Sequence, residues 1–351
     1  EHLLTTLNSL SNPEDIKIGF ESTAHYALNL ELFLENAHHS FMEVNPVLIK
    51  EYKKSTTLRR TKTDSVDCES IARWLITVEY KPHSKGFYHA YSLKSLTRLR
   101  DRLIRQRSFY LVKITNVLDH TFPEFKPFFN ERLSKTALYL LENYGSAEKM
   151  ARMNSASYDK LRCISRGKFS IQQFLRLKEL AANTVGVNNS IFDLELNTLL
   201  TLYKSLSDEI NTLETEIIKL IEEVHPHYMS IPGIGPISAA VIYAEYGDIS
   251  NFSNPGQMLA FAGIEPGIND SGTESHGGRM VKHGSSQLRY VLLNACLPLI
   301  RFDLTFATYY EKKRAEGKKH RVAITHVAKK LIRVIYALER QDVDFNAQKL
   351  R

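Results

Sequence analysis

The chain has 351 residues, of which 43% are hydrophobic and 24% charged, a balance typical of a folded protein with about two or three domains and not of a disordered tail. Lysine and arginine outnumber aspartate and glutamate by 46 to 39, a formal charge of +7 that suggests a polyanionic partner. The three cysteines are far apart and form no CxxC pair, which argues against a disulfide framework or a cysteine-rich zinc site. The sequence has no apolar run of 18 residues and no signal-peptide pattern, so we expect a cytoplasmic protein.

The first part of the chain alternates strand-like and helix-like patterns. Residues 16–21 alternate in character and predict a strand that ends at Glu21. Residues 24–36 have apolar positions at helical spacing, and residues 40–44 predict a second strand. Strands that alternate with helices predict an α/β layer with parallel strands, which we assign to residues 1–90.

From about residue 92 the pattern becomes almost wholly helical, so we expect a helical region over 91–223 and a separate C-terminal domain over 224–351. Between Leu199 and Leu220, apolar residues recur at alternating spacings of four and three. This repeat forms three heptads of a coiled-coil seam. A helix packed inside its own domain, a helical hairpin and an intermolecular coiled coil all remain open.

Two aspartates open a predicted helix after the second strand. Asp64 and Asp67 are three residues apart and therefore share a helix face. The same stripe continues through Cys68, Ile71 and other apolar positions, so both carboxylates are expected to face the sheet. Glu21 ends its strand at the carboxyl edge, where ligands bind in open α/β sheets.

These three carboxylates have two interpretations. Aspartates in a first helical turn are favoured by the helix dipole without any further role. Three carboxylates that converge without a basic partner would instead repel one another, unless they hold divalent cations such as Mg²⁺ or Mn²⁺. Two such ions are suited to phosphoryl transfer on DNA.

A proline- and glycine-rich segment opens the last part of the chain. Gly233 and Gly235 lie in a turn before a helical run to Tyr246, and such a turn exposes backbone N–H groups that suit a phosphate. The segment lacks the third glycine of a dinucleotide-binding fingerprint. A helix-hairpin-helix that binds the DNA backbone fits better, and a purely structural turn is the alternative.

A loop follows that is rich in glycine, serine and basic residues. Ser271 precedes a glycine, which lets a phosphate approach closely, and three cations follow that could neutralise phosphate charge: Arg279, Lys282 and Arg289. An ordinary turn is the plain alternative. A catalytic triad with His276 or His283 lacks a nucleophile-elbow context, and zinc binding by these histidines lacks a set of ligands.

Basic residues gather in three segments. Residues 92–113 carry seven cations, Arg102 and Arg105 among them, against the single acid Asp101, an imbalance that favours a phosphate-binding helix. A second cluster surrounds Gly317 and contains Lys312, Lys313, Arg314, Lys318, Lys319 and Arg321. A third flanks the aspartate pair with Arg59, Arg60 and Lys62. We expect nucleic acid to contact at least one of them.

At these residues the sequence resembles the DEDD transposases of the IS110 insertion sequences, including the IS1111 group, which are RNA-guided "bridge" recombinases. One anchor is Glu21 within residues 19–23, together with the segment 62–67, which resembles the family's RuvC-like domain. The second anchor resembles the family's C-terminal serine transposase domain. It consists of the turn 232–236, residues 261–266, Ser271-Gly272, residues 282–284 and 288–289. The resemblance covers nearly the whole chain.

The resemblance implies a role for each matching residue. Glu21, Asp64 and Asp67 would be three of four metal-binding carboxylates, and Ser271 would be the nucleophile that forms a covalent protein–DNA intermediate. It also implies a bacterial, nucleoid-associated homo-oligomer, a dimer or tetramer held by the coiled coil. The RuvC-like domain of one subunit would complete the site around the serine of another, and a guide RNA would pair with target and donor DNA.

One departure from the family concerns its first carboxylate, which lies on a strand that would precede Glu1, so we expect an incomplete RNase H-like sheet and weak catalysis by the chain as given. Two other functions stay open. A metal-dependent nuclease or resolvase would use water in place of Ser271. An inactive remnant would bind nucleic acid without cleaving it.

Overall fold

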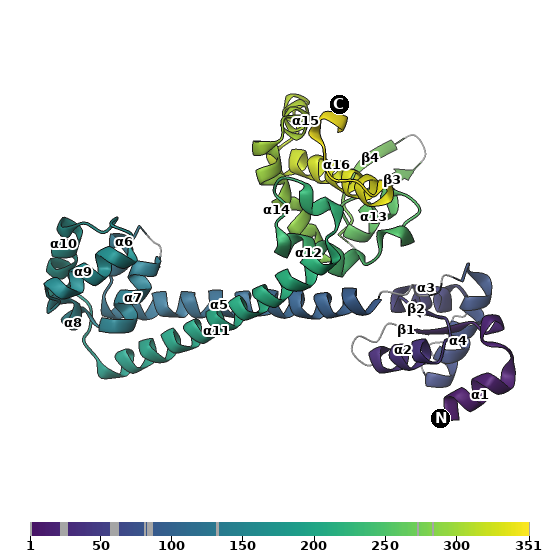
Figure 1. Ribbon diagram of the computed structural model, residues 1–351, viewed down its shortest axis with the longest axis horizontal. Helices are drawn as coiled ribbons and strands as arrows, with labels where there is room; N and C mark the ends of the chain where they lie inside the picture. Colours follow the sequence, from purple (N-terminus) through teal and green to yellow (C-terminus); the bar gives the residue numbers. More distant parts are fainter. Residues whose placement is uncertain are drawn as a thin grey trace. The chain divides into compact units, whose positions relative to one another are not determined.

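The computed structural model describes residues 2–350 except 22–26, 57–62, 81, 83–86, 131–132, 272–273 and 283, and leaves aside the side chains of 87–89, 266–271, 274–279 and 349–350. The chain divides into two compact units, Glu1–Tyr88 and His89–Arg351, shown with their helices and strands in Figure 1. The further domain limit expected near residue 224 stays a prediction.

The N-terminal unit is a small parallel sheet covered by helices. Its elements are α1 (His2–Leu10), η1 (Pro13–Asp15), β1 (Ile18–Glu21), α2 (Ala27–Asn36), β2 (Phe41–Val44), α3 (Pro46–Thr56) and α4 (Asp64–Thr77). Strands β1 and β2 pair in parallel from Ile18 opposite Phe41 to Glu21 opposite Val44. The parallel α/β layer expected from the alternating pattern is confirmed.

The two faces of this sheet are covered by different helices, because side chains alternate along a strand. On one face, Phe41 packs with Leu34 of α2 and Leu7 of α1. On the other face, Val44 packs with helices α3 and α4. Gly19 lies directly under α4, since a Cβ atom there would be 2.5 Å from the Leu75 Cδ1 atom. That strand position therefore needs glycine.

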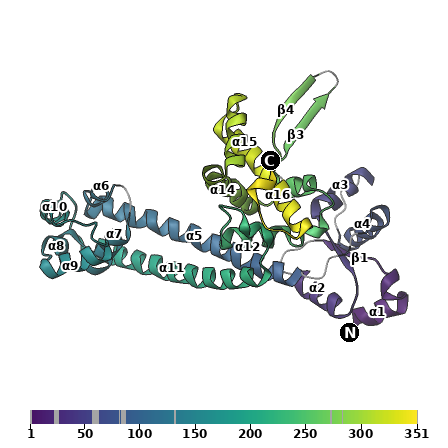
Figure 2. The same ribbon diagram turned by 45° about the horizontal axis from the view of Figure 1, so that its top comes forward.

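Two long helices organise the second unit: α5 (Phe87–Thr121) and α11 (Ser190–Val224). Leu93 near the start of α5 shares a core cluster with Ile217 near the end of α11. Leu118 near the end of α5 shares a second cluster with Leu196 near the start of α11. The helices therefore run antiparallel, and Figures 1 and 2 both show them side by side.

Five short helices connect the far ends of α5 and α11: α6 (Phe125–Phe128), α7 (Lys135–Tyr144), α8 (Ala147–Ala151), α9 (Ser155–Ile164) and α10 (Ile171–Ala182). Their apolar faces share one core with the ends of the two long helices. Serine or asparagine caps begin α7 to α10, each with a side chain that accepts a backbone N–H, and such caps fix where a helix starts.

The chain continues into α12 (Pro236–Tyr246), seven of whose eleven residues are buried. The remaining elements of the unit complete the C-terminal part of the chain. They are η3 (His227–Ser230), η4 (Ile249–Asn251), α13 (Pro255–Ala262), β3 (Pro266–Ser271), β4 (Glu274–Met280), α14 (Ser286–Phe302), α15 (Leu304–Ala315), α16 (His320–Gln341) and η5 (Ala347–Leu350). Within the described ranges, no single helix is long and apolar enough to cross a membrane. Helices α14 and α15 pass that test only as a pair bent by 105°.

The structure corrects one expectation in this unit. Residues 266–271 and 274–280, expected as part of a loop, form the paired antiparallel strands β3 and β4. The expectation failed because glycine, asparagine, aspartate and serine are depleted in strands, so composition favoured a loop. Backbone pairing overrides that preference, and Figure 2 shows the two strands side by side.

Candidate functional site

The carboxyl edge of the β1–β2 sheet is the first part of the candidate site. Glu21, the last residue of β1, is half-buried there. Tyr80, just after α4, lies at the opposite edge of the sheet, where the two strands begin. Its hydroxyl oxygen accepts a hydrogen bond from the Ile18 N–H at 3.2 Å and donates one to the Ser40 carbonyl oxygen at 3.0 Å. The end of α4 therefore lies beside the start of both strands. The helix runs antiparallel to them, and its first turn points toward the edge where Glu21 lies.

The first turn of α4 carries both predicted aspartates. Thr63 caps the helix by accepting the Val66 N–H at 3.4 Å. Asp67 is half-buried, whereas Asp64 and the neighbouring Cys68 are exposed. The expectation that both carboxylates face the sheet is therefore wrong for Asp64, which is exposed, and it stays a prediction for Asp67.

A basic partner at Asp67 was missed from the sequence. The ammonium group of Lys53, on α3, forms an ion pair with the Asp67 carboxylate. One signal was available: Lys53 follows the buried Ile49 by four residues, so the two share the helix face that contacts α4. The assumption that these carboxylates lack a basic partner is wrong.

The fit of this edge to a metal ion rests on its donor atoms. Carboxylate oxygens are the ligands that Mg²⁺ and Mn²⁺ prefer. Lys53 already supplies positive charge at Asp67, the charge that a divalent cation would supply when bound. Across the residues described here, no three histidine, cysteine or acidic side chains are close enough to hold a metal ion together. Glu21, Asp64 and Asp67 supply the right kind of donor atom but are not gathered into such a group, and their assignment as metal ligands stays a prediction.

A second acidic feature of this unit, also missed from the sequence, lies on the α2 face of the sheet. Glu31 of α2 is only 2% exposed and lies beside Glu43 of β2. Burial, together with the neighbouring Glu43 carboxylate, raises the pKa of Glu31 to about 7. A protonated Glu31 can donate a hydrogen bond to the Glu43 carboxylate, so Glu31 is expected to lose its proton near neutral pH.

In the glycine turn before α12, the backbone closely approaches helix α14. Gly233 has a φ of +97°, and a Cβ atom there would lie 2.8 Å from the Pro298 Cγ atom of α14. Gly235 precedes Pro236 at the helix start, and a Cβ atom there would meet no atom within 4 Å. The first glycine is required by packing, whereas the second leaves open space at a helix N-terminus that a phosphate could enter.

The hairpin that carries Ser271 has a well-defined root. The Val281 N–H donates to the Glu265 carbonyl oxygen at 3.0 Å. Arg289 of α14 donates from Nη1 to the Ala262 carbonyl oxygen at 3.1 Å, at the end of α13. Arg289 therefore clamps the hairpin root, and its expected contact with phosphate stays a prediction.

Several predicted residues of this segment lie outside what the structure describes. Ser271 ends β3 opposite Glu274 of β4, and Arg279 lies within β4, but their side chains and that of His276 are not described. Lys282, just beyond β4, is exposed. The residues not described include Ser22, Thr23, Arg59, Arg60, Lys62, Gly272 and His283.

The basic face expected on α5 is partly occupied by ion pairs. Arg98 pairs with the buried Glu245 of α12 at 3.0 Å, and Arg100 pairs with Glu214 of α11. Arg98 therefore ties α5 to α12, and Arg100 ties α5 to α11. Arg102 is exposed, and Arg105 pairs within its own helix with Asp101 at 2.9 Å. The two residues singled out as nucleic-acid contacts are thus both exposed, although Arg105 is engaged with Asp101.

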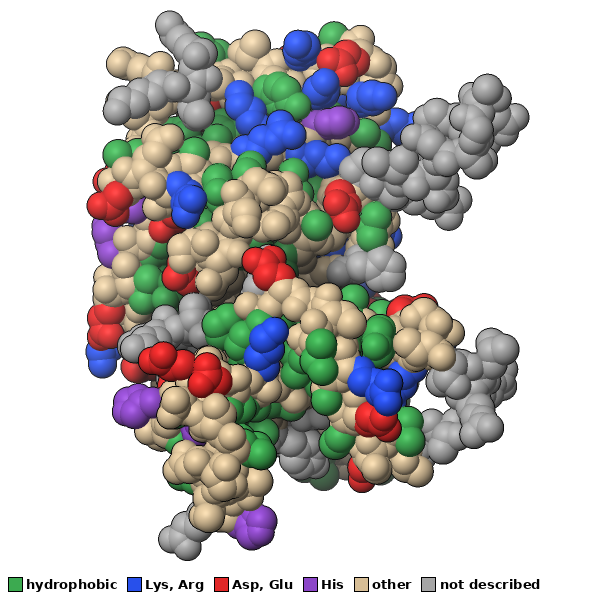
Figure 3. Space-filling view, turned by 90° about the vertical axis from the view of Figure 1, so that its right-hand side faces the viewer, with side chains coloured by type: hydrophobic (Ala, Val, Ile, Leu, Met, Phe, Trp, Pro, Cys, Tyr) green, Lys and Arg blue, Asp and Glu red, His purple; other side chains and the backbone are tan. Residues whose placement is uncertain are grey.

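The basic cluster at the α15–α16 turn is less engaged with acids. Lys313 pairs with Glu316 at 2.9 Å, while Lys312, Lys318, Lys319 and Arg321 have no ion pair in the part of the chain that the structure describes. Figure 3 shows lysine and arginine side chains gathered in its upper half. The α15–α16 turn therefore carries surplus positive charge.

Two family profiles match the chain, one from its start through α5 and the other after α11. Residues 1–123 match a profile described as "Transposase" of the DEDD type from IS110. Residues 226–311 match the "Transposase IS116/IS110/IS902 family". The first match contains Glu21, Asp64 and Asp67, and the second contains Ser271.

Curated relatives span both regions. The chain is 27% identical to the 43.6 kDa protein of insertion element IS110 from Streptomyces coelicolor, over 67% of the chain and 60% of that protein. It is 28% identical to the 42 kDa protein of IS900 from Mycobacterium paratuberculosis, over 80% and 71%. The transposase of insertion sequence element IS1111A from Coxiella burnetii is 25% identical, over 74% and 59%. The chain thus spans about 60% of the length of the first and third of these relatives.

Proposed function

Because the chain belongs to the transposase family of the insertion sequences IS110, IS116 and IS902, we propose that it cuts and rejoins DNA by attack of the Ser271 hydroxyl on a phosphodiester. The observation that supports this most is the position of Glu21 and the first turn of α4 at one edge of a parallel sheet. Acidic residues at such an edge suit phosphoryl transfer.

The reaction is a transesterification that conserves the number of phosphodiester bonds. A bond forms between the Ser271 Oγ atom and phosphorus, and the bond from phosphorus to one deoxyribose oxygen breaks. The proton of the serine leaves to solvent or a base, and the released deoxyribose oxygen takes up a proton. A second hydroxyl then reverses the step, so no external energy source is needed.

The chain's own groups have separate tasks in this proposal. Glu21, Asp64 and Asp67 would hold Mg²⁺ or Mn²⁺, which when bound lowers the charge on the attacked phosphate. The turn at Gly235 would bind a backbone phosphate at the α12 N-terminus. Arg102, Arg105, Arg279 and Lys282 would neutralise neighbouring phosphates.

Two partners belong to the same proposal. We infer that a second copy of the chain docks along α5 and α11, because apolar side chains remain outward there, such as Phe109 with 57% and Leu194 with 69% of its surface exposed. A monomer in sedimentation equilibrium would contradict this. A guide RNA of the element would pair with DNA, and equal affinity for that RNA and a scrambled RNA would contradict it.

The experiment compares the full chain with Ser271→Ala on end-labelled duplex DNA and Mg²⁺, and an exposed serine of α11, Ser205→Ala, is the matched control. We expect a covalent protein–DNA adduct on denaturing gels with the wild type and with Ser205→Ala, and none with Ser271→Ala. Cleavage that persists in Ser271→Ala without an adduct would instead identify a nuclease that uses water.

Binding without cleavage is a second candidate function, and the Lys53 ion pair at Asp67 favours it. A bound ion at Asp67 would have to displace this ammonium group. DNA or RNA binding that survives chelation, with no cleavage or adduct at any Mg²⁺ or Mn²⁺ concentration, would support this candidate over the transposase reaction.

A further inference from the structure

Helix α16 carries a row of cations on the side turned away from the core. His326, Lys329 and Arg333 follow one another at spacings of three and four residues, so they share one helix face. Lys330 is next to Lys329 and four residues from His326. Among the residues that the structure describes, none of these four groups forms an ion pair with a carboxylate.

The row is rigid and only partly hydrated. Nine residues on the opposite side of α16 are buried, so the helix cannot turn its cations away. Lys329 and Lys330 are both half-buried, and burial lowers the pKa of each. The neighbouring Arg333 lowers the pKa of Lys329 further. Two acids lie near the row, Glu265 near Lys329 and Asp303 near Lys330, and they oppose this lowering. The crowded cations still repel one another, and a bound anion would relieve that repulsion.

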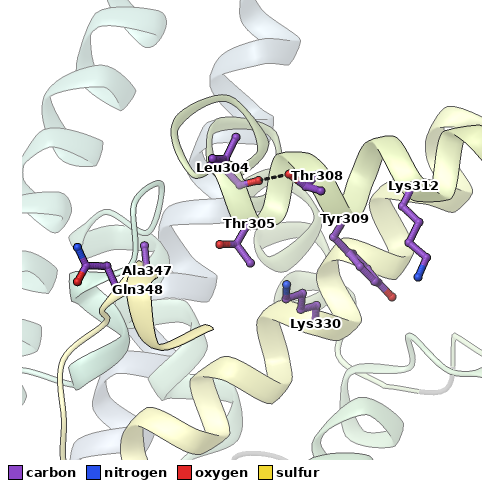
Figure 4. A pocket seen from close by; sticks show the side chains of 8 residues that line it. All are labelled: Leu304, Thr305, Thr308, Tyr309, Lys312, Lys330, Ala347 and Gln348. Atoms are coloured by element: carbon purple, nitrogen blue, oxygen red, sulfur yellow. Dashed lines mark hydrogen bonds between the residues drawn. The ribbon is translucent and has the colours of Figure 1, made fainter. Parts of the chain in front are cut away.

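Lys330 extends into a hollow of about 410 Å³ between α15, α16 and η5, shown in Figure 4. Its Nζ atom lies 5.1 Å from the Phe306 ring centroid and 5.3 Å from that of Tyr309. These rings hold the ammonium group in place. Lys312 and Thr305 also line the hollow, which therefore offers two ammonium groups and a hydroxyl as donors.

The row leads from the basic α15–α16 turn toward the root of the hairpin that carries Ser271. At one end, His326 lies near Lys313 and Lys318 of that turn. Burial lowers the pKa of His326 most, and Lys329, Lys313 and Lys318 lower it further. In the middle of the row, Lys329 lies near Glu265, whose carbonyl oxygen accepts the Val281 N–H at the hairpin root. From His326 to Arg333 the helix rises about 10 Å, the length of about three nucleotides along one strand of a duplex.

We propose that the α16 row, His326, Lys329, Lys330 and Arg333, binds consecutive phosphates of a nucleic-acid strand that passes the root of the β3–β4 hairpin. The ligand is a phosphodiester backbone, not a single free phosphate, because the cations form a line and do not converge on one point. This inference rests on the proposed function and adds the strand's path to it.

The test measures binding by fluorescence anisotropy with a labelled DNA duplex, its single strand and the matching RNA, across a range of salt concentrations. The variant is Lys329→Gln with Lys330→Gln. The matched control is Lys160→Gln with Lys168→Gln, two exposed lysines on and after α9 that give the same change in net charge. Lys330→Arg tests whether a cation restores binding at the hollow.

We expect the variant to weaken binding equally across DNA sequences and to reduce the slope of log Kd against log salt by about 2, one for each lost contact. The control keeps the wild-type slope, and Lys330→Arg keeps it too. The probe whose binding the variant weakens most, whether duplex, single strand or RNA, identifies the kind of strand that α16 binds. Because Lys330 packs on two rings, Lys329→Gln alone serves as a second variant with an expected loss of about 1.

Two outcomes contradict different statements. If the wild type binds nucleic acid and the variant has the same slope of log Kd against log salt as the control, the α16 assignment is overturned. The proposed function is then left standing. A wild type without salt-dependent binding to any of the three probes overturns the proposed function and this inference together.

Discussion

The Glu31–Glu43 pair predicts how the stability of the N-terminal unit depends on pH. Glu31 has a usual pKa of 4.5, which rises to about 7 in the folded protein because of burial and the neighbouring Glu43. A raised pKa means that the folded state holds the proton more tightly than the unfolded state. The linked stability is therefore fully present below pH 4.5 and is lost as the pH rises through about 7.

The size of the effect follows from the shift. One pKa unit corresponds to about 1.4 kcal/mol, so the loss between pH 4.5 and pH 8 is roughly 2 to 3 kcal/mol in the wild type. Glu31→Gln stays neutral at every pH, and its amide can donate a hydrogen bond to Glu43 as the protonated acid does. We expect this variant to lose less stability over that range and to exceed the wild type at pH 8.

Urea unfolding followed by tryptophan fluorescence measures this change. Trp74, the sole tryptophan, lies in α4 against the core of the N-terminal unit, so its signal reports on that unit and not on the long helices. Glu35→Gln, on the same helix, is the control and should follow the wild type. If Glu31→Gln and the wild type lost the same free energy of unfolding between pH 5 and pH 8, the assignment of this pair would be refuted.

Two other substitutions test the geometry of the candidate site. Gly233→Ala should destabilise the second unit by roughly 1 to 3 kcal/mol, because its φ of +97° is strained for alanine and Pro298 blocks the Cβ atom. Gly235→Ala, with open space, should change thermal unfolding by circular dichroism far less; equal losses would contradict this packing. Lys53→Met should destabilise the first unit by about 1 kcal/mol, since it leaves the half-buried Asp67 without its ion pair. Adding Asp67→Asn should recover part of that loss in the Trp74 signal, and strictly additive losses would show that the two residues do not interact.

The amino-acid sequence by itself determined the local elements. The alternation at residues 16–21 predicted β1, which the structure places at Ile18–Glu21, and the second predicted strand forms at Phe41–Val44. Helical spacing also predicted the long helices, since amphipathic periodicity is a local property. The heptad positions of α11 were visible too, but not their partner, because several surfaces can cover the same apolar stripe.

Tertiary structure decided which residues meet across the chain. Heptad residues such as Ile217 pack in the same core as Leu93 of α5, within one chain. Arg98 belongs to the basic segment that predicted a phosphate-binding helix, but it pairs with Glu245, which lies 147 residues away. Long-range pairs of this kind leave no periodic signal in the sequence.

The sheet edge with Glu21 and the hairpin with Ser271 show the same division between what the sequence determined and what the tertiary structure decided. Residue types and spacing pointed to Glu21, Asp64 and Asp67, but only the Tyr80 contacts fixed the direction of α4 and brought its first turn to the edge where Glu21 lies. Strand pairing, and not composition, made a hairpin of the Ser271 segment. Composition and periodicity act over a few residues, whereas helix direction, ion pairs and strand pairing depend on packing between distant segments.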